Sequence, residues 1–234
     1  MLSHREYIRR GYWRKLCVHS RMVIVMSLVL YGAGFLLFFS LEYMNSLKDL
    51  PFDEKLLAAM FQSVTARTAG FNTVDIGSMT NAMLFIMLIL MFVGASPGSC
   101  GGGIKTTTFA VLIASLVARF RLREDVNFFQ RRIPEETVSR VISIVSFSAV
   151  IVILFTVVLM IFEVPRLSHH DTSGQFMDYL FEVVSAFGTA GLSTGVTAEL
   201  SVVGKLAITI LMFIGRLGPL TVALAMHGRH RGPR

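Results

Sequence analysis

Two long segments without a charged residue dominate this sequence. Residues 22–41 and residues 141–162 contain no Asp, Glu, Lys or Arg. A helix of about 20 predominantly apolar residues spans the hydrocarbon core of a bilayer, and both segments reach that length. The chain is 53% hydrophobic and 16% charged, whereas soluble domains carry about 25% charged residues. The sequence therefore predicts an all-α membrane protein in which both segments cross the lipid bilayer.

The charged residues are distributed by membrane side. Basic residues gather before the first span, between residues 119 and 140, and at the C-terminal end, whereas residues 42–55 and 163–182 are mainly acidic. Because Lys and Arg accumulate in cytoplasmic loops, we expect a multi-pass protein of the plasma membrane with both termini in the cytoplasm. The net charge of +7 then needs no nucleic-acid partner. The basic residues are Arg5, Arg9, Arg10, Arg14, Lys15 and Arg21, then Arg119, Arg121, Arg123, Arg131, Arg132 and Arg140, then Arg229, Arg231 and Arg234.

A repeat with a constant offset of 121 residues organises the chain. Three separate anchors share this offset, which is typical of an internal duplication. We therefore predict two copies of one unit, at residues 1–125 and 126–234. The anchors are Glu42 with Glu163, TAGFNT (68–73) with TAGLST (189–194), and MFVG (91–94) with MFIG (212–215).

Each unit has the same predicted order of segments. A full span is followed by an acidic loop, a short apolar helix, the Thr-Ala-Gly tract and a second long hydrophobic segment. The short helices are predicted at residues 56–65 and 179–186, and segments of this length are typical of re-entrant loops. Basic segments before and after each unit require an even number of crossings. The sequence predicts two membrane-pore-membrane hairpins with re-entrant pore loops.

The tract after each short helix has the composition of an ion filter. Irregular backbone at membrane depth must be buried in protein or line an aqueous cavity, because each unpaired amide in lipid costs several kcal/mol. Potassium filters replace the hydration shell of the ion with backbone carbonyls, and Gly70 and Gly191 supply the backbone freedom that this needs. The C-terminal partial charge of the short helix also favours a cation. A helix-packing patch of small residues is the alternative, but the duplication of the tract favours a filter.

Residues 94–103 interrupt the second long hydrophobic segment of the first unit. Five glycines and Pro97 cannot hold a continuous helix. We expect helices at residues 81–93 and 106–120 with a site or gate between them; a cytoplasmic loop is the alternative. A phosphate-binding loop is excluded, because Ile104 separates Gly103 from the lysine. The sequence thus argues against a nucleotide-hydrolysing enzyme.

Two arginines near these segments are candidate functional residues. Arg67 has no counterpart in the second tract, and we expect it behind the filter or near its outer mouth, bonded to neighbouring carbonyls; a surface cation is the alternative. Arg216 lies roughly 24 Å along a helix that begins near Leu200, and a buried arginine in a membrane signals function. We expect its partner to be a carbonyl of the Gly-rich break or a carboxylate of another subunit. Snorkelling to the cytoplasmic surface is the alternative.

These motifs resemble the Trk/Ktr/HKT superfamily of potassium transporters. The resemblance rests on SVTARTAGFNT, FVGASPGSCGGGIKTTT, FEVVSAFGTAGLST and FIGRLGPLT, and it covers nearly the whole chain. It implies four membrane-pore-membrane repeats around one potassium pathway, and this chain is similar to the third and fourth.

The resemblance also implies roles for individual residues. K⁺ would bind at backbone carbonyls of the filter, including those of Gly70 and Gly191, and Arg216 would lie near the gate loop. The implied filter positions are Thr68, Ala69, Gly70, Phe71, Thr189, Ala190, Gly191 and Leu192. The implied gate-loop positions are Gly94, Ser96, Pro97, Gly98, Gly101, Gly102, Gly103 and Lys105.

The resemblance further implies partners. Members of the superfamily tend to form homodimers and pair with a cytosolic nucleotide-binding regulatory subunit, so we expect no cofactor on this chain besides the transported K⁺. Two repeats are absent, so the chain is a fragment, one product of a split gene, or a half that dimerises to rebuild four filter strands. A secondary transporter of a small solute and a non-conducting membrane interaction module are the alternatives.

Overall fold

The computed structural model describes residues 16–99, 101–122, 125–128, 131–164, 172 and 174–217. The basic residues from Arg5 to Lys15, Arg123 and the basic C-terminal tail lie outside these residues. The end of the second unit's last hydrophobic segment, beyond Leu217, lies outside them as well.

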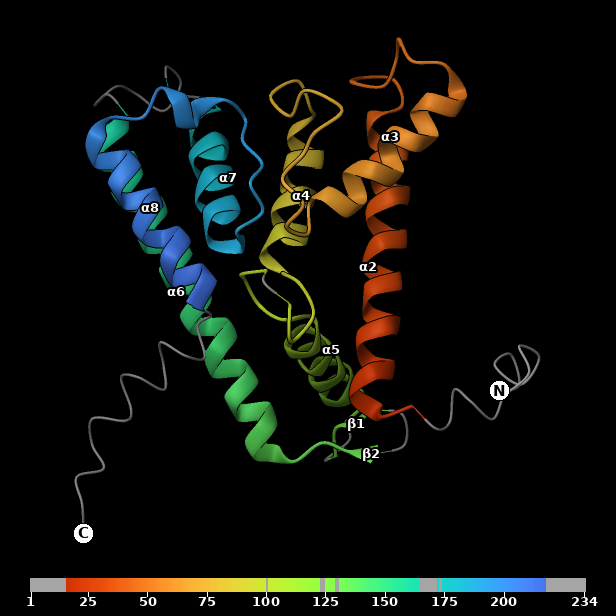
Figure 1. The fold of residues 1–234 in the computed structure, drawn as a ribbon. Helices are drawn as coiled ribbons and strands as arrows, with labels where there is room; N and C mark the ends of the chain where they lie inside the picture. Colours follow the sequence, from red (N-terminus) through yellow and green to blue (C-terminus); the bar gives the residue numbers. More distant parts are fainter. Residues whose placement is uncertain are drawn as a thin grey trace, which may run out of the picture.

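Two long helices form the flanks of the molecule (Figure 1). They are α2 (Val18–Glu42), with 25 residues, and α6 (Glu135–Glu163), with 29 residues. Both are long and apolar enough to cross a membrane. They extend beyond the predicted spans at 22–41 and 141–162, because a charged residue can occupy the end of a spanning helix. At the start of α6, for example, Glu135 and Glu136 lie in the first turn, where the helix dipole stabilises acidic side chains.

Two helices have 14 residues, α3 (Phe52–Thr65), which crosses α2, and α7 (Gln175–Gly188). The predicted starts at residues 56 and 179 were wrong by four residues. Pro51 and Gly174 precede the helices, and acidic residues follow them in each first turn. At 1.5 Å per residue each helix is about 21 Å long, still short of the roughly 30 Å hydrocarbon core. Figure 1 shows both in the same half of the molecule, which we call the short-helix end.

The second hydrophobic segment differs between the two units. In the first unit it forms α4 (Asn81–Phe92) and α5 (Thr106–Phe120), and residues 93–105 between them are not helical. The predicted bounds of α5 were correct, and α4 ends one residue early. The ends of the intervening loop meet, because the Ile104 amide donates to the Phe92 carbonyl at 3.1 Å. In the second unit, α8 (Val202–Leu217) continues without a break to the last described residue, after the short 3₁₀ helix η1 (Val196–Ala198).

A small hairpin that was not predicted connects the units. Strands β1 (Asn127–Phe128) and β2 (Arg131–Arg132) pair antiparallel between α5 and α6. The Arg132 guanidinium forms an ion pair with Asp125 at 2.9 Å. Figure 1 shows this hairpin opposite the short-helix end, near the start of α6, and we call this the hairpin end.

A carboxylate joins the two membrane segments within each unit. Glu42, at the end of α2, accepts hydrogen bonds from the amide and hydroxyl of Thr80, which caps α4. Glu163, at the end of α6, accepts the same pair of bonds from Ser201, just before α8. Both pairs obey the offset of 121 residues. A side-chain acceptor at this place satisfies amides that the start of a helix leaves unbonded.

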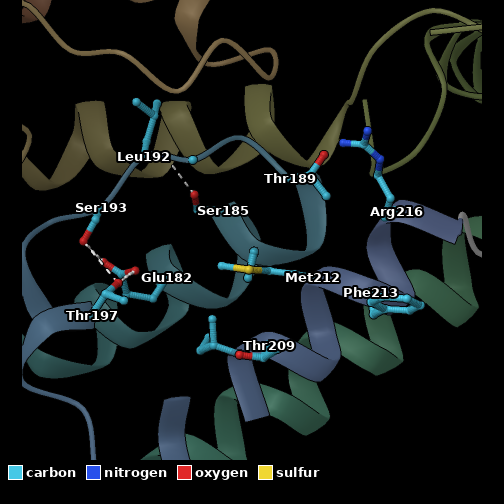
Figure 2. A pocket seen from close by; sticks show the side chains of 13 residues that line it. Glu182, Ser185, Thr189, Leu192, Ser193, Thr197, Thr209, Met212, Phe213 and Arg216 are labelled. Atoms are coloured by element: carbon cyan, nitrogen blue, oxygen red, sulfur yellow. Dashed lines mark hydrogen bonds between the residues drawn. The ribbon is translucent and has the colours of Figure 1, made fainter. Parts of the chain in front are cut away.

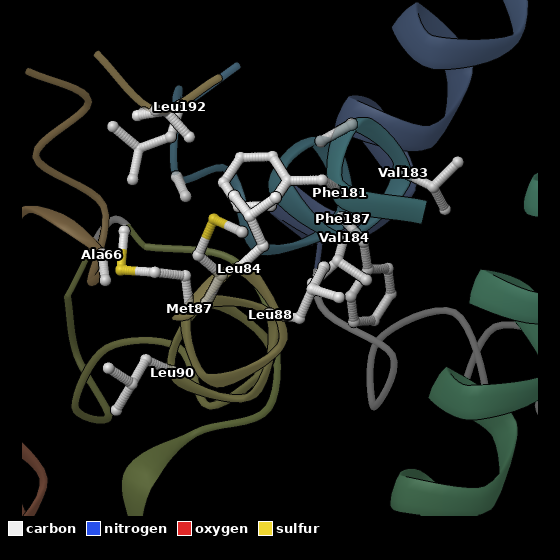
Figure 3. Close-up of a cluster of buried hydrophobic side chains, with 14 of the residues drawn as sticks. Ala66, Leu84, Met87, Leu88, Leu90, Phe181, Val183, Val184, Phe187 and Leu192 are labelled. Atoms are coloured by element: carbon white, nitrogen blue, oxygen red, sulfur yellow. The ribbon is translucent and has the colours of Figure 1, made fainter. Parts of the chain in front are cut away.

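The main hydrophobic core joins the two units, where α4 packs against α7. Figure 3 shows side chains of α4 facing Phe181, Val184 and Phe187 of α7. Phe181 and Phe187 have no exposed surface, and the rings of Phe92 and Phe187 stack at 5.9 Å. Within a membrane such an interface is stabilised mainly by van der Waals packing, because lipid tails are as apolar as these side chains. This core holds the second short helix against the first unit; α3 packs mainly against α2. The α4 side chains in this interface include Leu84, Met87 and Leu88.

Gly215 sets the distance between α8 and the end of α7. A Cβ atom at this position would lie 2.0 Å from the Phe187 carbonyl oxygen, too close for any side chain. Gly215→Ala is therefore expected to push α8 away from α7 and lower the melting temperature of the purified protein in detergent by several degrees. Gly32→Ala in α2 is the matched control, because nothing lies within 4 Å of its Cβ position. Equal melting temperatures for the two variants would contradict the predicted clash.

Candidate functional site

The two Thr-Ala-Gly tracts, 121 residues apart in sequence, meet at their glycines. A Cβ atom on Gly191 would lie 3.1 Å from the Cα of Gly70, and one on Gly70 would lie 3.0 Å from the Ala190 carbonyl oxygen. Both glycines have positive φ, 78° for Gly70 and 83° for Gly191. A side chain is disfavoured here by backbone conformation and by space, so these positions require glycine.

The threonine that begins each tract also has positive φ. The value is 73° at Thr68 and 50° at Thr189. A left-handed conformation is a true outlier for a β-branched residue and costs of order 1–3 kcal/mol. Such strain persists only where the surroundings hold it, and it gathers at functional sites. The two tracts therefore share an unusual backbone conformation as well as a sequence.

A hydroxyl in the last turn of each short helix holds the residue after the tract glycine. In the first unit, the Phe71 amide donates to Thr65 Oγ1 at 3.1 Å, and this hydroxyl in turn donates to the Phe71 carbonyl. In the second unit, the Leu192 amide donates to Ser185 Oγ, also at 3.1 Å. Each tract is thus tied back to its own short helix.

Glu182 of α7 supports the second tract from behind. Its carboxylate is 4% exposed and accepts bonds from the Thr194 amide at 3.1 Å and from the hydroxyls of Ser193 and Thr197. Aligning the last turns of the short helices pairs Glu182 with Gln62 of α3. Gln62 is fully buried, and neither atom of its amide has a partner within the described ranges. The first tract therefore lacks the carboxylate support of the second.

A cavity of about 660 Å³ opens beside the second tract, between α7 and α8. Thr209, Met212 and Arg216 line it from one stripe of α8, and Thr189 and Glu182 line it from the α7 side (Figure 2). Figure 2 shows Arg216 at the same end of the cavity as Thr189. The cavity thus lies between polar groups of α8 and the second tract.

Arg216 differs from its sequence expectation. Its side chain is exposed in this chain, and the structure shows no hydrogen bond or ion pair to it from the residues it describes. The expected carbonyl partner in this chain is thus not found among the described residues, and a carboxylate of another subunit stays a prediction. The residue before Arg216 in α8 approaches the loop instead, because a Cβ on Gly102 would lie 2.9 Å from the Gly215 carbonyl oxygen.

The Gly-rich loop at residues 93–105 touches the inner end of both tracts. The Gly102 amide donates to Thr189 Oγ1 at 2.8 Å, and a Cβ on Gly101 would lie 3.0 Å from Thr68 Cγ2. Within the loop, Lys105 Nζ donates to the Gly101 carbonyl at 2.6 Å. A Cβ on Gly94 would lie 1.9 Å from the Gly102 carbonyl oxygen, so the two arms of the loop pack directly against each other.

The remaining predicted loop residues lie farther from the tracts. Ser96 accepts a turn hydrogen bond from Ser99, and Gly98 has φ of 86° with nothing within 4 Å of its Cβ position. Ser96 and Pro97 are half-buried, and Gly98 is exposed. The contacts with the tracts come from the second half of the loop, where Gly101, Gly102 and Gly103 are buried.

Comparison with known proteins identifies the family. The family model described as "TrkH: Cation transport protein" matches residues 11–230. The chain belongs to this cation transport family. This family is one of cation transport proteins and not of enzymes.

Relatives in this family carry names of potassium transport systems. The chain is 38% identical over 218 residues to Ktr system potassium uptake protein B of Bacillus subtilis, covering 92% of this chain and 47% of that protein. It is 36% identical to the potassium/sodium uptake protein NtpJ of Enterococcus hirae, covering 91% and 46%. The crystal structure of the potassium transporter TrkH from Vibrio parahaemolyticus matches with a TM-score of 0.70 at 20% identity, covering 93% and 45%. The chain spans about half the length of these relatives and has the all-α membrane fold of TrkH.

Sequence reasoning misplaced or missed several site residues. Arg67 is half-buried, and no described residue forms a hydrogen bond or ion pair with its side chain, so the expected carbonyl contacts were wrong. Gln62 and Glu182 were missed because they align at an offset of 120, one less than the tracts. The extra residue, Gly188, hides this pairing; comparing the last turns of the short helices separately would have found it.

Proposed function

We propose that this chain supplies two filter segments and the gate loop of a potassium uptake pathway in the plasma membrane. K⁺ is coordinated by backbone carbonyls of residues 68–71 and 189–192, including those of Gly70 and Gly191. The loop at residues 94–105 acts as the gate, with Arg216 beside it. One observation carries the proposal: the two tracts meet at their glycines, with the Gly-rich loop against their inner ends.

The chemistry of the site favours a cation. Backbone carbonyls replace the hydration shell of K⁺ in potassium filters. Helices α3 and α7 end directly before the tracts, so the partial negative charge of each C-terminus lies beside them. The names of relatives as potassium uptake proteins support K⁺ as the cargo. No resident cofactor is required, and a nucleotide would bind a separate cytosolic regulatory subunit.

Two exposed surfaces support the proposal that this chain is part of a larger ring of membrane-pore-membrane units. Phe181 and Val184 of α7 are buried against α4, but their counterparts in α3, Phe61 and Val64, are 39% and 46% exposed. On α8, the stripe Lys205, Thr209, Met212 and Arg216 is exposed, and its polar members are unsuited to lipid. At the offset of 121, this stripe corresponds to the face of α4 that packs against α7. Both surfaces fit further membrane-pore-membrane units of the same kind.

We assign these units to a companion segment, the two missing N-terminal repeats. The domain division at residues 1–125 and 126–234 follows from the same repeat, supported by the matched carboxylate contacts of Glu42 and Glu163. The hairpin end faces the cytoplasm, where Arg119, Arg132 and Arg140 lie, and both termini lie on that side. The complete transporter forms a homodimer.

Growth rescue tests the proposal. A strain lacking potassium uptake would express this chain alone, or with the part of the Bacillus subtilis Ktr system potassium uptake protein B that the match leaves uncovered. We expect growth at low potassium only when both are present, because four filter segments are then available. Rescue by the chain alone would show that copies of the chain complete the ring themselves. Absence of rescue with both polypeptides folded in the membrane would contradict the proposal.

A further inference from the structure

A hydrogen bond connects the gate loop to the filter. The Gly102 amide donates to Thr189 Oγ1 at 2.8 Å, joining residues 87 positions apart. The bond is partly buried, and an amide left without an acceptor in such a place is costly.

The loop also packs closely against the Thr189 side chain. A Cβ on Gly102 would lie 2.8 Å from Thr189 Cγ2 and 2.9 Å from the Gly215 carbonyl oxygen, so the loop lies between the second tract and α8. On the first tract, Gly101 only packs against the Thr68 side chain. The two threonines have the same place in the repeat and the same left-handed conformation, and the hydroxyl of Thr189 accepts a hydrogen bond from the loop.

We propose that Thr189 is the latch of the gate loop: its hydroxyl holds the loop against the inner end of the filter, and loss of this bond releases the loop. Thr189 acts through the loop and is a positioning residue for the gate. The inference rests on the proposed function of residues 94–105 as a gate. It predicts an asymmetric gate, released from the second unit and insensitive to the hydroxyl of the first.

Accessibility of the loop to a thiol reagent tests the latch. The full 234-residue chain would carry Ile104→Cys as a probe, with Cys17→Ser and Cys100→Ser to remove the native thiols. Ile104 is a buried residue of the loop, 2% exposed, so a thiol at this position reacts only when the loop opens. In liposomes, Thr189→Val is expected to raise the rate of maleimide labelling about fivefold, the factor that corresponds to one hydrogen bond. Valine keeps the shape and β-branching of threonine, so the left-handed backbone gains no new strain.

Two matched variants complete this experiment. Thr189→Ser retains the hydroxyl and is expected to keep the parent rate, and Thr68→Val removes the equivalent hydroxyl of the first tract without a change in rate. An unchanged rate in Thr189→Val, or an equal rise in Thr68→Val, would overturn the latch. Labelling needs no ion flux, so this result is independent of the growth test for potassium uptake.

A second variant keeps the proposal testable if Thr189→Val fails to fold. Gly102→Ala leaves the Thr189 hydroxyl in place but adds a Cβ that crowds Thr189 and Gly215. Gly102→Ala is therefore also expected to raise the rate of maleimide labelling. Where both single variants fold, the double variant should label no faster than the faster single one, because both changes break the same contact. Labelling rates that multiply in the double variant would overturn the latch.

Discussion

Gly191→Ser is expected to lower Rb⁺ uptake at least about tenfold when the chain is assembled with its companion segment. We also expect Na⁺ to compete with Rb⁺ for uptake more strongly than in the parent protein. Gly191 has φ of 83°, where any other residue pays about 1–2 kcal/mol. Its new Cβ would also lie 3.1 Å from the Cα of Gly70, so the two tracts would have to separate. Separation would move the carbonyls that replace the hydration shell of K⁺, and selectivity depends on their placement.

Rb⁺ uptake with and without competing Na⁺ measures this effect in cells that carry both polypeptides. Gly195→Ser is the matched control, because Gly195 also has positive φ, 108°, but nothing lies within 4 Å of its Cβ position. Gly195→Ser should therefore introduce a similar backbone strain without crowding a neighbouring segment. Unchanged uptake and Na⁺ competition in Gly191→Ser would contradict the filter assignment. An equal loss in Gly195→Ser would attribute the effect to strain alone.

Glu42→Ala is expected to remove most of the folded protein. Glu42 has no exposed surface and accepts bonds from the Thr80 amide at 2.9 Å, the Thr80 hydroxyl at 2.7 Å, and the side chains of Asn45 and Ser46, each at 2.8 Å. Alanine leaves these donors without an acceptor in a buried place, and each buried donor without a partner costs about 1–3 kcal/mol. The contact joins α2 to α4, so its loss weakens the first unit as a whole.

The melting temperature of the purified protein in detergent measures this loss, and the fraction of the protein that is monodisperse is a second measure. We expect a decrease of roughly 5–15 °C for Glu42→Ala. Glu163→Ala should have a smaller effect, because Glu163 is half-exposed and, in the part of the chain that the structure describes, Ser201 supplies its hydrogen bonds. Glu54→Ala, at an exposed position in α3, serves as the neutral control. A melting temperature for Glu42→Ala equal to that of Glu54→Ala would contradict the role of Glu42.

The bounds of the helices show which sequence signals were sufficient to predict where a helix begins. The start of α5 was predicted because the Gly-rich break leaves no other place for a helix to begin. The short helices began four residues before their predicted starts, at Phe52 and Gln175. The prediction followed the apolar residues and ignored Pro51 and Gly174, although proline and glycine commonly border helices. The hairpin β1–β2 was missed because two-residue strands leave no periodic pattern.

The candidate site was only partly visible in the sequence. The tracts could be found because TAGFNT and TAGLST recur at one offset. The positive φ of Thr68 and Thr189 could not be found, because threonine rarely adopts this conformation. The bond between Gly102 and Thr189 could not be found either, since it joins residues 87 positions apart with no shared motif.

The sequence by itself determined the class of this protein: long uncharged segments must lie in a membrane, and a duplicated Gly-containing tract must lie where irregular backbone is tolerated. The tertiary structure decided which tract carries Glu182 behind it, which threonine holds the loop, and which glycines have no room for a side chain. These are properties of contacts between distant segments. The Thr-Ala-Gly sequence is the same in both tracts, and packing gives the equivalent residues Thr68 and Thr189 different neighbours.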